Sequence, residues 1–299
     1  MDERLDVRPS PLAGRWYPAN PQVLTQRIDE YLSSALPPAI EGEIVGIIAP
    51  HAGHQYSGPV AAYAYALLQG LNFELVAILA PQHRPYFAAY VTSAHQAYET
   101  PLGIVPIDHE ALRVLEKHLQ REVGETLKRV YADEEHSLEI HLPFLQRVLG
   151  SFHLLPIMIG IDEPRRLKAL GIALAEVLKD HQALIVASTD LSHFYPQPLA
   201  EKLDREMLRR MEEFDPLVFL QAEIEGKGFA CGRSAVAAAM WAARELGANR
   251  IRVLHYATSG EVTGNYHEVV GYGAAVITVL RSRKKRALWR FDCPIFLKS

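Results

Sequence analysis

Three short apolar runs, each leading into a histidine, constrain the fold of this chain more than any other feature. Runs of this length, rich in Ile and Val and closed by Pro or polar residues, are typical of strands buried on both faces of a parallel sheet. Ligand sites in such sheets lie beyond the carboxyl ends of the strands. The three imidazoles are therefore expected to converge, as they would in a metal site or an acid–base site. The runs and their histidines are 44–50 with His51, 75–82 with His83, and 183–190 with His193.

Segments of helical character alternate with these and other apolar runs. The expected helices span 58–68, 108–119, 137–149, 164–178, 198–212, 216–223 and 234–246, and the other expected strands span 88–93, 152–159, 251–256 and 272–280. Pro143 must lie near the start of its helix or bend it. No repeat or Pro/Ser-rich linker divides the chain. We therefore expect one α/β domain over residues 1–280, with a central, largely parallel or mixed β-sheet flanked by helices.

Composition limits the classes of partner and compartment. The 299 residues are 49% hydrophobic, enough for a large core, and the net charge of -4 gives no reason to expect nucleic acid or an anionic membrane as partner. Two cysteines, Cys231 and Cys293, are too few for a disulfide framework and favour a reducing compartment. No apolar stretch approaches the roughly 18 residues of a membrane span. The sequence therefore predicts a cytoplasmic protein.

Residues 281–299 differ in character from the rest. A basic run over 281–286 is followed by the aromatic residues Trp289, Phe291 and Phe296. Such a tail could dock a partner. The interpretation that we favour is a solvated charge run with an aromatic patch folded back on the domain, because charge runs are usually solvated.

The segment after the first run contains two histidines. Gly53 separates them and permits close approach of the backbone. His51 or His54 could bind a metal, since neutral imidazole is the commonest protein ligand for one. The alternative for each is a histidine that caps a carbonyl or packs in the turn. His83 leaves a second strand in the same Ala-Pro context, which strengthens the metal interpretation.

A carboxylate accompanies the third histidine. Asp190 could ligate a metal directly, or orient a histidine and fix its tautomer. Ser192 precedes His193, but no Gly-x-Ser-x-Gly elbow exists to support a serine hydrolase. His193 itself has the ordinary imidazole pKa that suits proton transfer at neutral pH.

Cys231 lies just before the helix that is expected to begin at residue 234. A helix N-terminus and the neighbouring Arg233 would both lower the pKa of its thiol and favour the thiolate, which binds metals and attacks carbon. The alternative is a small buried apolar residue, as most free cysteines are.

Residues 133–141 are dense in potential ligands. Their spacing fits neither His-Glu-x-x-His nor His-x-x-Glu-His. His136 and Glu139 can share a helical face, whereas His141 points elsewhere. We therefore expect helix capping and substrate contact here rather than a helical zinc site.

Taken together, these segments resemble the MEMO family, whose prokaryotic members are also called AmmeMemoRadiSam system protein B. No single motif is decisive, but the ordered set is specific and spans about 13–279. The matching segments are 13–18 with Trp16 and Tyr17, 49–53 with His51, 81–83, 135–143 with His136 and His141, 188–193, and 231–233.

The resemblance implies a fold similar to that of class III extradiol dioxygenases of the LigB type. It also implies a mononuclear iron site whose ligands are His51, His83 and Cys231, with Cys231 in place of a glutamate of those enzymes. His193 then corresponds to their acid–base histidine, with Asp190 beside it. The substrate-contact set is Trp16, Tyr17, His54, His136, His141 and Arg233.

Two positions depart from the family pattern. His54 stands where members commonly have an aromatic residue, and Ala80 stands where they often have glycine.

The functions that we expect follow from the ligand set. Two histidines and a carboxylate form the facial triad of oxygen-activating Fe(II) sites, and a thiolate in place of the carboxylate makes Zn(II) or Cu(I) more competitive. We expect a non-haem iron, dioxygenase-like oxidoreductase. The alternatives are a non-catalytic metal-binding scaffold that recognises a peptide or small ligand, and a zinc hydrolase. By resemblance, proteins of the AmmeMemoRadiSam system are expected partners.

Overall fold

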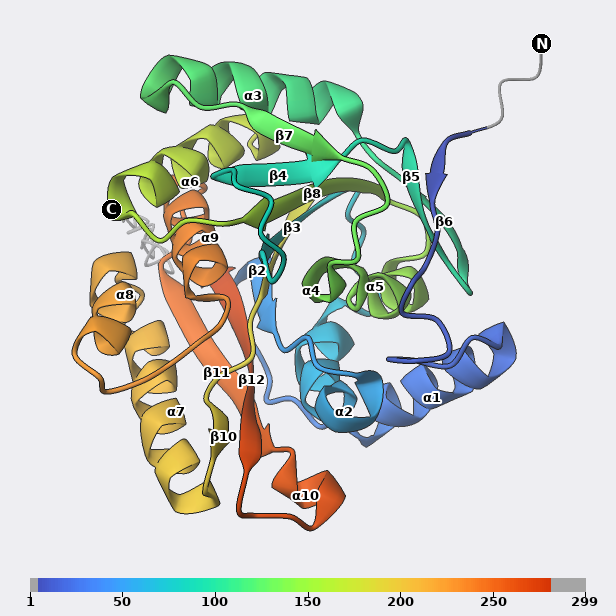
Figure 1. Ribbon diagram of the computed structural model, residues 1–299, viewed down its shortest axis with the longest axis vertical. Coiled ribbons are helices and arrows are strands. Elements are labelled where there is room, and N and C mark those ends of the chain that lie inside the picture. The colour runs from blue at the N-terminus through green and yellow to red at the C-terminus, as the bar shows by residue number, and fades with distance from the viewer. Residues whose placement is uncertain (1–4, 281–299) are drawn as a thin grey trace, which may run out of the picture.

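The computed structural model describes residues 5–280, and the basic and aromatic tail predicted at 281–299 lies outside these residues. A nine-stranded mixed sheet forms the centre of the described chain (Figure 1). Its strand order is β10-β12-β2-β9-β3-β8-β4-β7, and β11 also pairs with β12. The strands are β2 (Glu43–Ala49), β3 (Leu75–Pro81), β4 (Tyr90–Ser93), β7 (Leu127–Val130), β8 (His153–Ile159), β9 (Ala183–Ser188), β10 (His193–Tyr195), β11 (Arg250–Thr258) and β12 (Val269–Val279).

The four middle strands of this sheet run parallel to one another. β9 pairs with β2 on one side and with β3 on the other, and β3 pairs with β8. Antiparallel pairs, such as β12 with β2 and β4 with β8, extend the sheet on both sides. The prediction of a largely parallel or mixed sheet is therefore confirmed. The three strands predicted to begin at residues 44, 75 and 183 are β2, β3 and β9, and they lie side by side in the order β2-β9-β3.

A small second sheet joins the N-terminal segment to the domain. Its order is β1-β5-β6, with β1 (Val7–Arg8), β5 (Ala97–Thr100) and β6 (Gly103–Pro106). β1 runs parallel to β5 through the pairs Val7↔Ala97 and Arg8↔Tyr98.

Helices cover the main sheet. α2 packs on β2, β11 and β12, with α1 and α5 against it, whereas α9 packs on β2, β3 and β9, with α6 and then α3 beyond it (Figure 1). α7 packs on β10, β11 and β12, and α8 packs on α7 and α9. The helices are α1 (Pro21–Ser34), α2 (His54–Tyr65), α3 (His109–Val123), α4 (His136–Glu139), α5 (Leu142–Leu149), α6 (Pro164–Leu178), α7 (Gln197–Glu212), α8 (Pro216–Ile224), α9 (Arg233–Glu245) and α10 (Gly260–Thr263).

Local chemistry explains where the helices depart from the predicted bounds. The helix predicted over 137–149 is two helices, because Pro143 occupies the first turn of α5, a position where its missing N–H costs nothing. α2 begins at His54, four residues before the predicted start, so that Pro59 lies inside it. α1 was not predicted, although Asn20 caps it and accepts a hydrogen bond from the backbone N–H of Val23.

The described helices include none that combines the length and the apolar character needed to cross a bilayer.

Candidate metal centre

The topology of the main sheet brings two of the predicted histidines together. β2, β9 and β3 are parallel neighbours, so their carboxyl ends meet at one edge of the sheet. His51 follows the end of β2 by two residues, and His83 follows the end of β3 by two. Their ring centroids lie 5.2 Å apart. The convergence of these two side chains is as the apolar runs predict.

A third imidazole joins them from a segment for which we predicted a substrate-contact role. His136, the first residue of α4, stacks on His83 with ring centroids 4.4 Å apart, and its centroid lies 5.4 Å from that of His51. One potential ligand atom from each of the three histidines lies within 4.8 Å of the other two. Nitrogens that share one cation at the usual bonds of ~2 Å lie at most ~4 Å apart, so small side-chain movements from this spacing would let the three bind one cation.

Hydrogen bonds at Ser188 fix the tautomer of His51. The hydroxyl of Ser188 donates its single hydrogen to the carbonyl oxygen of Ser137 at 2.7 Å. The Nδ1 of His51 lies 2.7 Å from the same hydroxyl oxygen, which can therefore only accept. His51 must carry its hydrogen on Nδ1, so its Nε2 is an unprotonated lone pair.

The carboxylate of Glu135 acts in a similar way on His83. Its Oε1 lies 2.8 Å from Nδ1 of His83, whereas Nδ1 of His136 is 3.4 Å away. Burial raises the pKa of Glu135, but its hydrogen bonds to His83 and the electrostatic attraction of that ring outweigh burial and lower it to about 2. An ionised carboxylate can only accept, so His83 donates from Nδ1. In the neutral form of His83, Nε2 is then the unprotonated nitrogen. Carboxylate–histidine pairs of this kind orient metal ligands in proteins.

The electrostatics of His51 and His136 oppose their protonation. Burial lowers the pKa of His51 well below its usual value, and electrostatic interactions with the neighbouring His136 and His83 lower it further. Burial likewise lowers the pKa of His136, to about 4. Three imidazoles this close together form a donor set that fits a divalent transition metal.

Cys231 lies beside this group rather than inside it. Its Sγ is 3.2 Å from Nε2 of His51, and it accepts a hydrogen bond from the backbone N–H of Asp190 at 3.3 Å. Burial and the neighbouring Asp190 raise the pKa of the thiol, so it is protonated in the metal-free protein. A cation bound to His51 would reverse this, because a coordinating thiol loses its proton.

The side chain of Asp190 is hydrogen-bonded to the backbone of His51. Its Oδ1 accepts a hydrogen bond from the N–H of His51 at 2.7 Å, and its Oδ2 lies 3.9 Å from Nε2 of that residue. Burial raises the pKa of Asp190 to about 7. We predicted that Asp190 could orient a histidine, and the residue that it holds is His51, not His193.

His193 begins β10, and its ring contacts those of Phe194 and Phe229 at 5.7 and 5.6 Å. Its Nδ1 is buried without a hydrogen-bond partner among the described residues. Burial lowers the pKa of His193, with a smaller contribution from its electrostatic interaction with His83, so the ring is neutral at pH 7.

The two N-terminal aromatic residues differ in role. Trp16 is partly buried and stacks on His136 with ring centroids 4.4 Å apart, so it covers one side of the histidine group. Tyr17 is buried and donates its hydroxyl hydrogen bond to Glu139 at 2.6 Å. Substrate contact therefore stays a prediction for both, and Trp16 is the better placed.

His54 and His141 lie in the core. Nε2 of His54 donates to the carbonyl oxygen of Ile140 at 2.9 Å, and Nδ1 of His141 lies 2.7 Å from the hydroxyl of Tyr65. Burial lowers their pKa values to about 4 and about 3. Substrate contact stays a prediction for these residues too, and it requires a ligand to reach the interior.

Arg233 is engaged in ion pairs. Its guanidinium lies 2.9 Å from Asp162 and 2.8 Å from Glu223. A role in substrate binding, which we predicted, would require it to exchange one of these carboxylates for the ligand.

Two residues that orient the histidines were missed in the sequence. Ser188 ends a buried strand, and the sequence gives no signal that separates its hydroxyl from other strand-end serines. Glu135 carried a signal, since an acidic residue before a helix is a typical N-cap, and it does cap α4 through hydrogen bonds from the N–H groups of His136 and Ser137.

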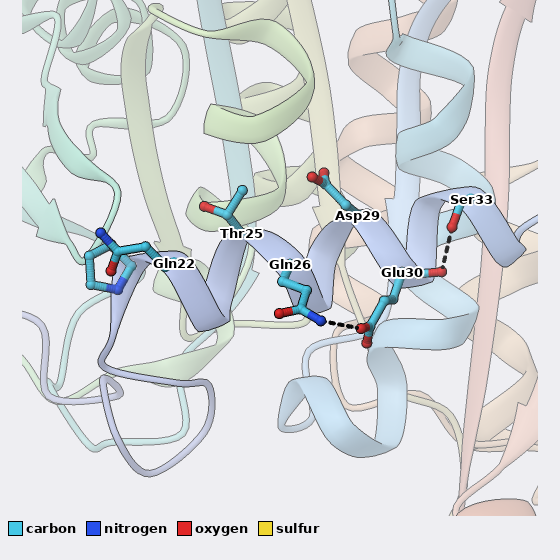
Figure 2. Close-up of a pocket in the computed structure, with 7 residues that line it drawn as sticks. Gln22, Thr25, Gln26, Asp29, Glu30 and Ser33 are labelled. Atoms are coloured by element: carbon cyan, nitrogen blue, oxygen red, sulfur yellow. Dashed lines mark hydrogen bonds between the residues drawn. The ribbon is translucent and has the colours of Figure 1, made fainter.

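The surface hollow drawn in Figure 2 is not part of this centre. It has a volume of about 710 Å³ and is lined by seven residues of α1. These side chains are mainly polar, and two of them, Gln26 and Glu30, are joined by a hydrogen bond of 3.0 Å. The hollow contains no histidine or cysteine.

Comparison with known proteins agrees with the motifs. The chain matches the family described as "Memo-like protein" over residues 8–276. It is 34% identical over 278 residues to a "MEMO1 family protein" of Nitrosopumilus maritimus, covering 90% of this chain and 98% of the relative. It is 36% identical over 277 residues to one of Methanopyrus kandleri, covering 89% and 96%, and 32% identical over 283 residues to one of Thermotoga neapolitana, covering 91% and 100%. The chain belongs to the Memo-like protein family.

Proposed function

We propose that this protein binds one transition-metal ion through His51 and His83 and uses it as a non-haem, dioxygenase-like oxidoreductase. Iron as Fe(II) is the proposed metal, with zinc and copper as alternatives. The observation that carries the proposal is the convergence of the His51 and His83 rings, whose centroids lie 5.2 Å apart beyond the ends of two parallel strands and which each offer a ligand atom to one group.

The third ligand is Cys231 or His136. The thiol of Cys231 is 3.2 Å from Nε2 of His51, and the family resemblance favours it. His136 belongs to the group whose ligand atoms lie within 4.8 Å of one another. Thiolate would soften the centre and make Zn(II) or Cu(I) more competitive with Fe(II), and three imidazoles are a ligand set that catalytic zinc also uses.

The metal, when bound, would bring an electron-rich organic substrate and O₂ together and polarise them. The side chains provide the rest. Ser188 and Glu135 hold the ligand rings in one tautomer. His193, which is neutral at pH 7, would accept a proton from a substrate hydroxyl and return it later. Trp16 shields His136 from solvent.

The substrate class proposed by resemblance is a dihydroxylated aromatic compound, and the proposed protein partners are those of the AmmeMemoRadiSam system.

A zinc hydrolase is the second candidate, because His136 makes a three-histidine set available. Such an enzyme would use a metal-activated water and would be indifferent to O₂.

The test is turnover by protein purified without oxygen and loaded separately with Fe(II) and Zn(II). Oxygen consumption with catechol-type compounds, by the iron-loaded protein only, supports the oxidoreductase. Hydrolysis of ester or amide probes by the zinc-loaded protein, unaffected by O₂, favours the hydrolase. Metal binding without turnover across a broad substrate screen favours a scaffold that binds a peptide or small molecule in the metal cleft.

A further inference from the structure

Arg8 is a fully buried cation in the short strand β1. Its Nε and Nη2 donate to the two carboxylate oxygens of Asp133 at 2.8 and 3.0 Å, and its Nη1 donates to Glu139 at 2.5 Å. The guanidinium carbon lies 4.8 Å from the ring centroid of Tyr98, the residue that pairs with Arg8 across the small sheet. One side chain near the N-terminus thus joins two acidic residues more than 120 positions away.

The same guanidinium fixes the backbone of Glu135 on both sides of its α-carbon, on one side directly and on the other through Asp133. Nη2 of Arg8 donates to the carbonyl oxygen of Glu135 at 3.2 Å. Oδ1 of Asp133, which Arg8 fixes, accepts the backbone N–H of Glu135, also at 3.2 Å. The conformation of Glu135 is therefore set by Arg8 at both of its peptide groups.

The side chain of Glu135 leads directly to the histidine group. Its Oε2 accepts the backbone N–H of His83 at 2.6 Å, and its Oε1 lies 2.8 Å from Nδ1 of the same residue. Oε1 also accepts the backbone N–H of His136 at 3.0 Å. A continuous series of hydrogen bonds thus connects Arg8 to the imidazole of His83 and to the backbone of His136.

We propose that Arg8 is a positioning residue for the metal centre, which it aligns by fixing Glu135 in the conformation that orients His83 and His136. This inference rests on the proposed metal-binding function. Arg8 does not contact the imidazoles themselves.

The geometry requires arginine specifically. Its planar fork reaches both oxygens of Asp133, the carboxylate of Glu139 and a backbone carbonyl at once. A lysine ammonium would retain the charge that compensates the buried carboxylates, but it cannot make these contacts simultaneously. Charge and positioning can therefore be separated by one conservative substitution.

The experiment compares Arg8→Lys and Arg8→Met with a matched control, Arg210→Met. Arg210 is also a buried arginine, which contacts Glu206, Glu225 and the carbonyl oxygen of Val218 in α7 and α8, and none of these residues contacts the histidine group. Two readouts are needed. The first is the ¹⁵N NMR signals of the imidazoles in metal-free protein, which report the tautomer of His83. The second is the affinity for Fe(II) and Zn(II) in competition with a chelator.

We expect Arg8→Lys to fold, to weaken metal binding roughly 10-fold, the lower end of the effect of lost outer-shell partners, and to shift the His83 signals toward a mixture of tautomers. Arg210→Met should change neither readout. Wild-type His83 signals and wild-type metal affinity in a folded Arg8→Lys variant would overturn the proposal, even if Arg8→Met does not fold. If wild-type protein binds no metal, the proposed function fails, and the tautomer of His83 in metal-free protein still decides whether Arg8 positions this ring.

Discussion

The Sγ of Cys231 lies 3.2 Å from Nε2 of His51, although 180 residues separate them in the sequence. Because His51 carries its hydrogen on Nδ1, Nε2 is an acceptor for the thiol hydrogen, and the carbonyl oxygen of Asp190, 3.6 Å from Sγ, is a second one. A metal ion bound to Nε2 would compete for the same lone pair and would have the sulfur of Cys231 as a neighbouring donor. The following predictions test how these residues are held and what they bind.

Ser188→Ala should weaken metal binding without unfolding the protein. The substitution removes the acceptor that keeps the hydrogen of His51 on Nδ1, so the ring can also carry it on Nε2. Loss of such an outer-shell partner typically costs about 10- to 100-fold in metal affinity. Competition with a chelator measures the effect, and Ser33→Ala, at an exposed position of α1, is the control that should leave affinity unchanged. Equal affinity in the two variants would contradict the tautomer argument.

His54→Phe should make the metal-free protein less sensitive to acid. The pKa of His54 is lowered in the folded state to about 4, so below the unfolded value near 6.5 the unfolded state binds a proton that the folded state does not. Stability contributed by this residue is therefore present above pH 6.5 and is lost as the pH falls toward 4, by about 1.4 kcal/mol per pH unit. Urea unfolding between pH 4 and 7 should show a shallower pH dependence in His54→Phe than in wild type. An unchanged slope would show that His54 binds its proton equally well in the folded and unfolded states, which would contradict the lowered pKa.

Asp190→Asn should change the pH dependence in the opposite sense. The pKa of Asp190 is raised by burial to about 7, so between about pH 4 and pH 7 the folded state holds a proton that the unfolded state releases. Its contribution to stability is fully present below pH 4 and is lost as the pH rises to 7. The variant, which cannot ionise, should therefore gain stability relative to wild type as the pH rises through this range. Urea unfolding over the same pH range measures this gain. A difference in free energy of unfolding between the two proteins that stays constant at all pH values would contradict the raised pKa of Asp190.

Gly232→Ala should displace Cys231. A Cβ at this position would lie 2.0 Å from the carbonyl oxygen of Ser188 and 2.7 Å from Cβ of Thr189, so the backbone that carries the thiol must move. Overpacking of this kind typically costs about 1–3 kcal/mol or more. We expect a loss of stability in urea unfolding together with faster alkylation of Cys231, whose thiol is otherwise partly buried. If the variant has the stability and alkylation rate of wild type, the backbone at residue 232 accommodates the added Cβ without displacing Cys231, which would contradict the prediction.

His193→Gln should retain the metal and lose oxygen-dependent turnover. His193 has no bonded contact with His51, His83 or His136 among the described residues, and its proposed role is proton transfer. Elemental analysis and oxygen consumption, measured on the same preparation, separate the two properties. Loss of metal in this variant would instead identify His193 as a ligand.

The sheet could be predicted from the sequence because its central strands are buried on both faces. The strands β2, β3 and β9 consist mainly of consecutive Ile, Val, Leu and Ala residues. Amphipathic helices do not show such a pattern, because polar residues interrupt their apolar positions. The predicted helix over 164–178 has the bounds of α6, since Pro164 and the capping residue Glu163 mark its start unambiguously. Parallel pairing then brought His51 and His83 together without further information.

The rest of the centre depends on contacts that sequence patterns do not encode. His136 reaches the group because α4 is a single short turn, whereas the expected continuous helix over 137–149 hid that geometry. The substrate-contact set mixed residues with different environments, because an aromatic or histidine motif reveals nothing about which way a side chain faces. His54 and His141 are core residues, while Trp16 covers the histidine group. The role of Arg8 arises from pairing between β1 and β5, which are too short to be recognised by periodicity.

Metal content shows whether His51 and His83 bind one metal ion. Protein purified without oxygen, as wild type and as the His51→Ala, His83→Ala, His136→Ala and Cys231→Ser variants, would be analysed for iron, zinc and copper. We predict about one ion per chain in wild type, nearly none in His51→Ala and His83→Ala, and a loss in either His136→Ala or Cys231→Ser that identifies the third ligand. Wild-type protein without metal, or equal metal content in wild type, His51→Ala and His83→Ala, would contradict it.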